Sequence, residues 1–271
     1  RLSETQNVAA TMDKLMIKFK DTKPFYPAEL ERFLHGSSGD SGKAIKAYEA
    51  HLKWRASSLP LPATAPRFGR GEPKLPPWVL YLDGVTAIDG STIVFSPGAL
   101  CDPDLAKPEE YALAAAELLD SRLPRDESAK FTILIDTKGL KGGANPPAQK
   151  LVPYLQKLAS VIGYNFPGRL ASLVVYPVPS AMEWVWAGLK MFMDADTASK
   201  VKLLSGELAG EDEVRYPPSL AETINIEAVK KTAAAPLFAA GGKNAANALT
   251  IEAVSELCLA GYGLPEGAVK A

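Results

Sequence analysis

The first part of the chain repeats apolar side chains at helical spacing. The strongest repeat includes Ala44 and Tyr48, which fall on one face of a helix. Either Asp40 or Ser41 can cap its first turn, because both side chains accept hydrogen bonds from free backbone N–H groups. We therefore predict a helical subdomain over residues 1–57.

Six prolines then interrupt the pattern over residues 58–77. Proline has no backbone N–H to donate and its ring restricts the backbone, so such a stretch is excluded from helix and sheet interiors. We predict an extended connector between the helical subdomain and the rest of the chain.

Residues 78–205 alternate between short β-rich runs and longer helical patterns. The runs are 79–82, 92–95, 131–135, 173–176 and 201–204, and the helical patterns are 108–122, 147–163 and 180–193. Strands separated by helices of this length need crossover connections, which make neighbouring strands parallel. The run 131–135 is apolar on both faces, as is typical of a central strand. We predict an α/β fold in which N-terminal helices precede a mostly parallel five-stranded sheet flanked by helices.

The remaining residues, 206–271, are rich in Ala, Gly and Glu. INIEAV (224–229) and LTIEAV (249–254) resemble each other, and Asn225 and Thr250 are suited to cap helices at these places. We predict two short helices in a C-terminal helical extension.

One predicted helix, residues 180–193, is apolar on nearly every side. Only Glu183 and Lys190 carry charge, and they fall on one stripe because they are seven residues apart. A helix of this length extends ~21 Å, too short for the ~30 Å hydrocarbon core of a membrane. Such a helix is either deeply buried or contacts two apolar partners. Deep burial is the interpretation that the pattern alone favours.

Composition narrows the possible partners. The chain has 271 residues, 47% of them hydrophobic, enough for one large domain or two small ones. The net charge is −1 and no basic run exceeds a pair, so we expect no nucleic-acid binding. No apolar run approaches the ~20 residues of a membrane-spanning helix. The chain begins at Arg1 rather than Met, and we expect it to be a fragment or a processed form.

The residues that commonly hold metals are few. Cys101 and Cys258 lie far apart, and His35 and His51 are the only histidines. A structural zinc site needs about four such ligands at close spacing, so we predict no metal and no cofactor. The cysteine usage fits a reducing compartment, and we expect a cytoplasmic protein.

Two stretches resemble catalytic motifs without completing them. GSSGDSGKA (36–44) has Ser37 where a phosphate-binding loop needs its first Gly, and Ala44 replaces the metal-binding hydroxyl. We interpret it as a turn between helices. Asp136 ends the strand FTILID, and we expect it to cap the following turn. We predict no catalytic residues.

Several stretches occur in an order that is typical of one family. They are ERFLHGSSGDSGKAIKAYEAHLKWR (31–55), AIDGSTIVF (87–95), FTILIDTKGL (131–140) and NFPGRLASLVVYPVPSAMEWVWAGLKMFMDADTASKVKLL (165–204). Over about residues 30–205 the chain thus resembles the CRAL-TRIO lipid-binding family, which includes phospholipid, retinaldehyde and tocopherol carriers.

The resemblance implies a hydrophobic lipid pocket that residues 180–193 close as a gate helix. One face of the gate would shield the lipid and the other would dip into a membrane. The residues implied for the pocket and gate are Val174, Tyr176, Trp184, Trp186, Leu189, Phe192 and Met193. Burying an acyl chain of sixteen carbons contributes on the order of 12 kcal/mol, so the pocket must be long and apolar.

The resemblance also implies a headgroup site made of Arg169, Thr197 and Lys200. The phosphoinositide carriers have a Glu where this chain has Gly168, and an Arg-Lys pair where it has Ser37-Ser38. We therefore expect no strong preference for phosphatidylinositol over phosphatidylcholine or a neutral isoprenoid.

Two hypotheses about function follow. The first is non-catalytic binding and transfer or presentation of a phospholipid or isoprenoid between membranes, with transient peripheral contact at the membrane surface. The alternative is a protein-interaction scaffold, in which the same fold has a degenerate pocket and the tail 206–271 binds a partner.

Overall fold

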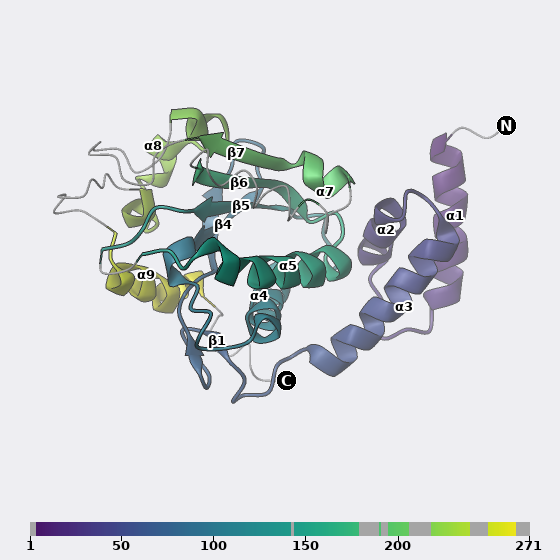
Figure 1. The fold of residues 1–271 in the computed structure, drawn as a ribbon. Coiled ribbons are helices and arrows are strands. Elements are labelled where there is room, and N and C mark those ends of the chain that lie inside the picture. Colours follow the sequence, from purple (N-terminus) through teal and green to yellow (C-terminus); the bar gives the residue numbers. More distant parts are fainter. Residues whose placement is uncertain are drawn as a thin grey trace.

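The computed structural model places three N-terminal helices beside an α/β domain (Figure 1). It describes residues 4–141, 144–178, 190, 195–205, 218–238 and 249–263. In that part of the chain, no helix combines the length and the hydropathy that a membrane-spanning segment needs.

The N-terminal helices form a small bundle with its own core. They are α1 (Glu4–Phe19), α2 (Pro27–Gly36) and α3 (Ser41–Ser58). Leu30 and Leu34 of α2 and Tyr48 of α3 are buried in this core, and the ring of Phe19 in α1 meets the Tyr48 ring edge-on with centroids 5.0 Å apart. Asp40 caps α3 by accepting a hydrogen bond of 2.9 Å from the backbone N–H of Lys43. The predicted helical subdomain is confirmed. Of the stretch GSSGDSGKA, residues 37–40 form the turn between α2 and α3, and residues 41–44 begin α3.

The five predicted strands form one sheet in chain order. They are β3 (Leu80–Thr86), β4 (Thr92–Pro97), β5 (Phe131–Asp136), β6 (Leu170–Val178) and β7 (Val201–Ser205). β3 pairs antiparallel with β4, and the remaining pairs are parallel. The predicted mostly parallel five-stranded sheet is confirmed, with β5 at its centre.

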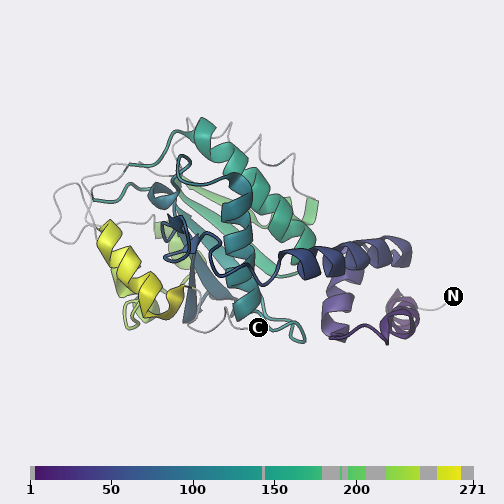
Figure 2. The ribbon, with the colours of Figure 1, turned by 90° about the horizontal axis from the view of Figure 1, so that it is seen from below.

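Different layers cover the two faces of the sheet (Figure 2). α4 (Pro108–Arg122) and α5 (Ala148–Asn165) lie on one face. The other face is covered by C-terminal segments, α8 (Ile226–Val229), η4 (Ala235–Phe238) and α9 (Ile251–Leu257).

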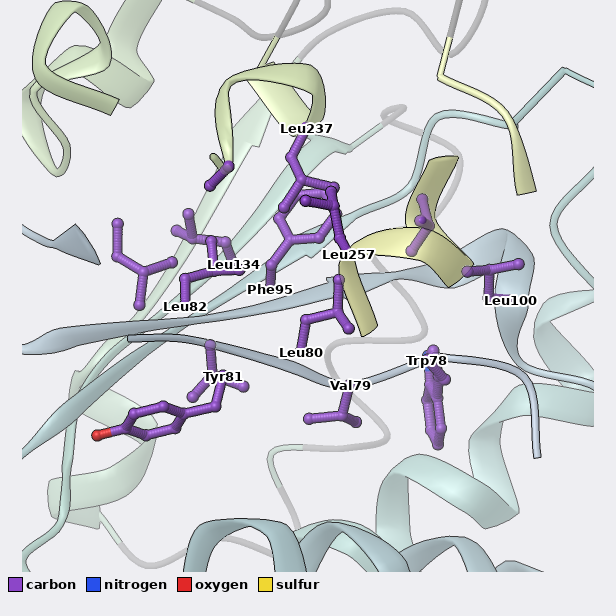
Figure 3. Packing of buried hydrophobic residues seen from close by; sticks show 14 of the residues in the cluster. Trp78, Val79, Leu80, Tyr81, Leu82, Phe95, Leu100, Leu134, Leu237 and Leu257 are labelled. Atoms are coloured by element: carbon purple, nitrogen blue, oxygen red, sulfur yellow. The ribbon is translucent and has the colours of Figure 1, made fainter. Parts of the chain in front are cut away.

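The C-terminal segments therefore belong to the main core. Figure 3 shows Leu237 and Leu257 packed over Leu80 and Phe95 of the sheet. Phe238 is also buried, and its ring centroid lies 5.7 Å from that of Phe95.

The two expected C-terminal helix caps are confirmed. The side chain of Asn225 accepts from the N–H of Ala228 at 3.0 Å, and that of Thr250 accepts from the N–H of Ala253 at 3.1 Å. The two similar hexapeptides thus begin two short helices that help to cover one face of the sheet.

The proline-rich connector is more ordered than an extended linker. It contains a short parallel strand pair, β1 (Arg67–Phe68) and β2 (Lys74–Leu75). Phe68 and Leu75 are buried in the core, and the buried guanidinium of Arg67 donates to the carboxylate of Glu117 on α4. The prediction of an extended stretch missed this anchoring.

Charged side chains join the helical bundle to the α/β domain. Glu29 of α2 accepts from Arg125 Nε at 2.7 Å, and its Oε1 lies 3.4 Å from His51 Nε2. Arg55 of α3 pairs with Asp120 of α4 at 2.6 Å. Burial alone would raise the pKa of Glu29, but interactions with His51 and Arg125 outweigh it and lower that pKa to about 2.

We expect Glu29→Gln to lower the free energy of unfolding at pH 7 by about 3 kcal/mol. The pKa of Glu29 is lower in the folded protein, so its ionised form stabilises the fold fully above pH ~4.5, and this contribution is lost as the pH falls toward 2. Urea unfolding at pH 7, 4.5 and 3 measures the difference between variant and wild type, which should shrink on acidification.

Glu49→Gln is the matched control, because Glu49 is exposed and pairs with an exposed Lys18 at 2.8 Å. We expect that change to cost less than about 1 kcal/mol at any pH. A Glu29→Gln effect of constant size from pH 7 to pH 3 would contradict a charge-based role.

Candidate functional site

A large cavity lies between the sheet and the two helices α4 and α5. Its volume is about 410 Å³, within the range of ~300–1,000 Å³ for small-molecule sites. Protein interiors are close-packed and have few voids larger than a water molecule. A void of this size between layers is therefore a candidate binding site.

Four strands and two helices contribute the described walls of the cavity. The strands supply Val94, Ser96, Phe131, Ile133, Ile135, Leu173, Val175, Val178 and Leu203. The helices α4 and α5 supply Ala115, Leu119, Ala148, Leu151, Leu155, Leu158, Ala159 and Ile162. The loops supply Trp78, Val79, Thr137, Asn145 and Pro146, and the short 3-10 helix η1 (Gly98–Leu100) supplies Gly98.

The central strand explains the shape of the floor. Successive side chains of a strand point to opposite faces, so Phe131, Ile133 and Ile135 of β5 share the cavity face. From Phe131 to Thr137 the strand direction covers ~20 Å, which makes the cavity long. Strand β5 is apolar on both faces because one face meets the packed core and the other meets the cavity.

Helix α5 supplies the opposite wall through one apolar stripe. Leu151, Leu155, Leu158 and Ile162 recur at spacings of four, three and four residues, so they share a face. All four are only partly buried although they face the sheet. Because they also line the cavity, an apolar ligand there would add to their packing.

The described lining contains no charged residue. Its side chains are almost all aliphatic or aromatic, and the hydroxyls of Ser96 and Thr137 and the amide of Asn145 are exceptions. Apolar cavities are poorly hydrated, because a water molecule needs two to four polar partners. The cavity therefore suits a long apolar ligand better than an ionic one.

Two predicted pocket residues lie on the other face of the sheet. Val174 and Tyr176 are fully buried in the main core, whereas Leu173 and Val175 line the cavity. Because side chains alternate along a strand, a shift of one position moves every residue to the opposite face. The run LVVY is apolar throughout, so its pattern does not identify the cavity face. The prediction that Val174 and Tyr176 line the pocket is wrong, because both lie in the core on the opposite face.

The predicted gate falls outside the part of the chain that the structure describes. The gate was predicted over residues 180–193, of which only the exposed Lys190 is described. The predicted gate residues outside the described part are Trp184, Trp186, Leu189, Phe192 and Met193. Their assignment to the pocket and gate stays a prediction.

The predicted headgroup residues lie at the amino ends of β6 and β7. Arg169 is buried, and its guanidinium donates to the backbone carbonyls of Ala129, at 2.7 Å, and Pro124, at 2.5 Å. It faces the polar junction with the N-terminal bundle and is not among the lining residues of the cavity. We therefore assign Arg169 a structural role and do not carry it into the headgroup site.

Thr197 and Lys200 lie together just before β7. Thr197 belongs to α7 (Ala195–Ser199), and Lys200 follows this helix. The Lys200 ammonium pairs with Asp196 at 2.5 Å, and a quarter of its side chain is exposed. This lysine is thus at the surface, near the amino ends of the strands, and its role toward a headgroup stays a prediction.

Gly168 has a backbone reason to be glycine. Its φ is +71°, in the left-handed region that other residues rarely adopt. A Cβ at this position would contact the side chain of Arg32 at 3.6 Å. That contact is an ordinary van der Waals distance, so it is the turn geometry that suits glycine where the Glu is missing.

The remaining candidates have structural roles. Asp136 is fully buried and accepts from the N–H of Lys138 at 2.8 Å, which confirms the predicted turn cap. Burial raises the pKa of Cys101 to about 12 and that of Cys258 to about 11, so both remain protonated thiols at neutral pH. Within the described ranges, no three His, Cys, Asp or Glu side chains are placed to hold a metal ion.

Sequence reasoning missed most of the cavity wall. The stripe on α5 was visible as a helical repeat, but nothing in the sequence showed that it faces an unfilled space. Asn145 had no signal at all, because a single amide in a loop rich in Gly and Pro is common.

Comparisons with known proteins agree with this architecture. The family model for the CRAL/TRIO domain matches residues 78–232. Among solved structures, the crystal structure of Sfh5 superposes with a TM-score of 0.57 at 13% identity, covering 76% of this chain and 82% of that one. At this identity the likeness concerns the fold. No curated protein sequence matches significantly.

Proposed function

Because the chain belongs to the CRAL/TRIO family of lipid-binding and lipid-transfer proteins, we propose that it binds one hydrophobic lipid in the cavity between the sheet and helices α4 and α5. We propose further that it transfers or presents this lipid between membranes without catalysis. The observation that carries the proposal is the apolar cavity of about 410 Å³ with no charged residue in its described lining.

Energetics favour lipid as the occupant. Each CH₂ group removed from water contributes about 0.8 kcal/mol, so the apolar wall can hold a hydrocarbon chain without a polar anchor. Along β5, the lining is apolar at Phe131 and becomes polar at Thr137 and Asn145. A cavity that extends in this direction suits an elongated ligand. Thr197 and Lys200, at the amino ends of the strands, would contact the ligand only if it were an anionic lipid.

We expect the protein purified from cells to carry about one lipid molecule per chain. Organic extraction followed by mass spectrometry measures this occupancy, and vesicle-to-vesicle transfer of the extracted lipid class measures activity. An empty protein that also binds no added lipid would overturn the proposal.

The scaffold hypothesis makes the opposite prediction for the same experiment. A degenerate pocket would be filled by side chains and would yield no extractable ligand. The open cavity argues against it, and so does the packing of Leu237 and Leu257 in the core, which engages much of the tail that a partner would need.

A further inference from the structure

An unused hydrogen-bond acceptor lies at the carboxyl end of the cavity. Asn145 lines the cavity from the segment between β5 and α5, and its Nδ2 donates to the backbone carbonyl of Thr137. Its Oδ1 is buried and has no hydrogen-bond partner among the described residues. Exchanging the two amide atoms would set oxygen against the Thr137 carbonyl oxygen, so the hydrogen bond determines which atom is left free.

The neighbouring backbone makes room for this oxygen. A Cβ on Gly98, which follows β4, would lie 2.9 Å from Oδ1 of Asn145, closer than side chains normally approach. Ser96, near the carboxyl end of β4, also lines the cavity. Asn145 and Ser96 are thus two polar side chains that line an apolar cavity near the carboxyl ends of β5 and β4, and we call them the polar patch.

The chemistry of the patch restricts the ligand. A buried carbonyl oxygen without a partner is costly, and an amide oxygen can only accept a hydrogen bond. The ligand must therefore donate one. A carboxylate or an ester has no donor, and an ammonium would have no counter-charge in the described lining. A hydroxyl satisfies the amide without introducing charge.

We propose that the ligand is a neutral lipid alcohol whose hydroxyl donates to Oδ1 of Asn145. The hydrocarbon part then extends along β5 toward Phe131, over the ~20 Å of the apolar floor. This inference rests on the proposed function, because it takes the cavity as the lipid site. It makes Asn145 the residue that distinguishes an alcohol from an acyl chain, whose terminal methyl group would leave the oxygen without a partner.

The test compares two ligands that differ only at the hydroxyl. The full 271-residue chain is freed of lipid and titrated with 1-hexadecanol and with its methyl ether, in competition with a fluorescent lipid. We expect the alcohol to bind at least about tenfold more tightly than the ether. In Asn145→Leu, which is similar in size but has no acceptor, this preference should disappear through weaker binding of the alcohol.

Leu155→Ala is the matched control, because it removes apolar contact from the same cavity without changing the polar patch. It should weaken both ligands by a similar factor. Equal affinity of the wild type for alcohol and ether would overturn the inference while leaving the lipid site in place. Failure of the wild type to bind either ligand, or any lipid, would instead overturn the proposed function. The comparison on the wild type holds even where Asn145→Leu folds poorly.

Discussion

Ala159→Phe should weaken lipid affinity at least about tenfold, and so lower lipid occupancy, without lowering the melting temperature. Ala159 lines the cavity from α5, so a phenyl ring at this position would occupy space that the ligand uses. Displacing only two CH₂ groups of a bound chain costs about 1.6 kcal/mol, which is more than a tenfold change in affinity. Filling an empty apolar space commonly stabilises a fold, so the melting temperature should stay the same or rise.

Extraction with mass spectrometry and a vesicle-transfer assay measure the functional effect, and thermal unfolding measures stability. Ala50→Phe makes the same chemical change on the exposed face of α3 and should leave occupancy unaltered. Full occupancy in Ala159→Phe would show that the lipid lies elsewhere. A large fall in melting temperature would show overpacking and require a smaller substitution, Ala159→Val, in the same assay.

The largest loss of stability should come from Arg67→Ala, at about 3–5 kcal/mol. Arg67 is buried and donates to Glu117 Oε2 at 2.6 Å and to the carbonyls of Leu61, at 2.6 Å, and Pro62, at 2.8 Å. The Glu117 carboxylate also accepts from the N–H of Leu61 at 2.8 Å. Without the guanidinium, the buried Glu117 carboxylate loses its counter-charge and several carbonyl groups lose a hydrogen-bond donor.

Urea unfolding at neutral pH measures this cost. Arg70→Ala is the control, since Arg70 is a half-buried arginine of the same loop with no side-chain hydrogen bond or ion pair in the described structure. The double change Arg67→Met with Glu117→Leu should recover part of the loss, because it removes both buried charges. A cost below about 1 kcal/mol for Arg67→Ala would mean that the connector is not anchored through this pair.

The sequence determined the elements and their order. The helices over 1–57, the five strands and helix 108–122 were predicted because periodicity, caps and proline positions act over a few residues. The buried strand at 131–135 and the turn cap at Asp136 followed from the same local signals. The family also followed from the sequence, since its motifs occur in order along the chain.

Only the tertiary structure decided which residues meet across the layers. Arg67 and Glu117 are 50 positions apart, and neither residue type signals a buried pair. The face of β6 was ambiguous because LVVY is apolar at every position, so only packing showed that Leu173 and Val175 line the cavity while Tyr176 lies in the core.

Asn145, in the candidate site, is the clearest example of a property that the sequence alone does not reveal. Its amide is an acceptor for a ligand only because Nδ2 is held by the carbonyl of Thr137 and because Gly98, which follows β4, leaves room for Oδ1. Apolar periodicity is a local property, so it can be read directly from the sequence. The availability of one buried oxygen depends on groups brought together from three segments, and therefore appears only once the chain is folded.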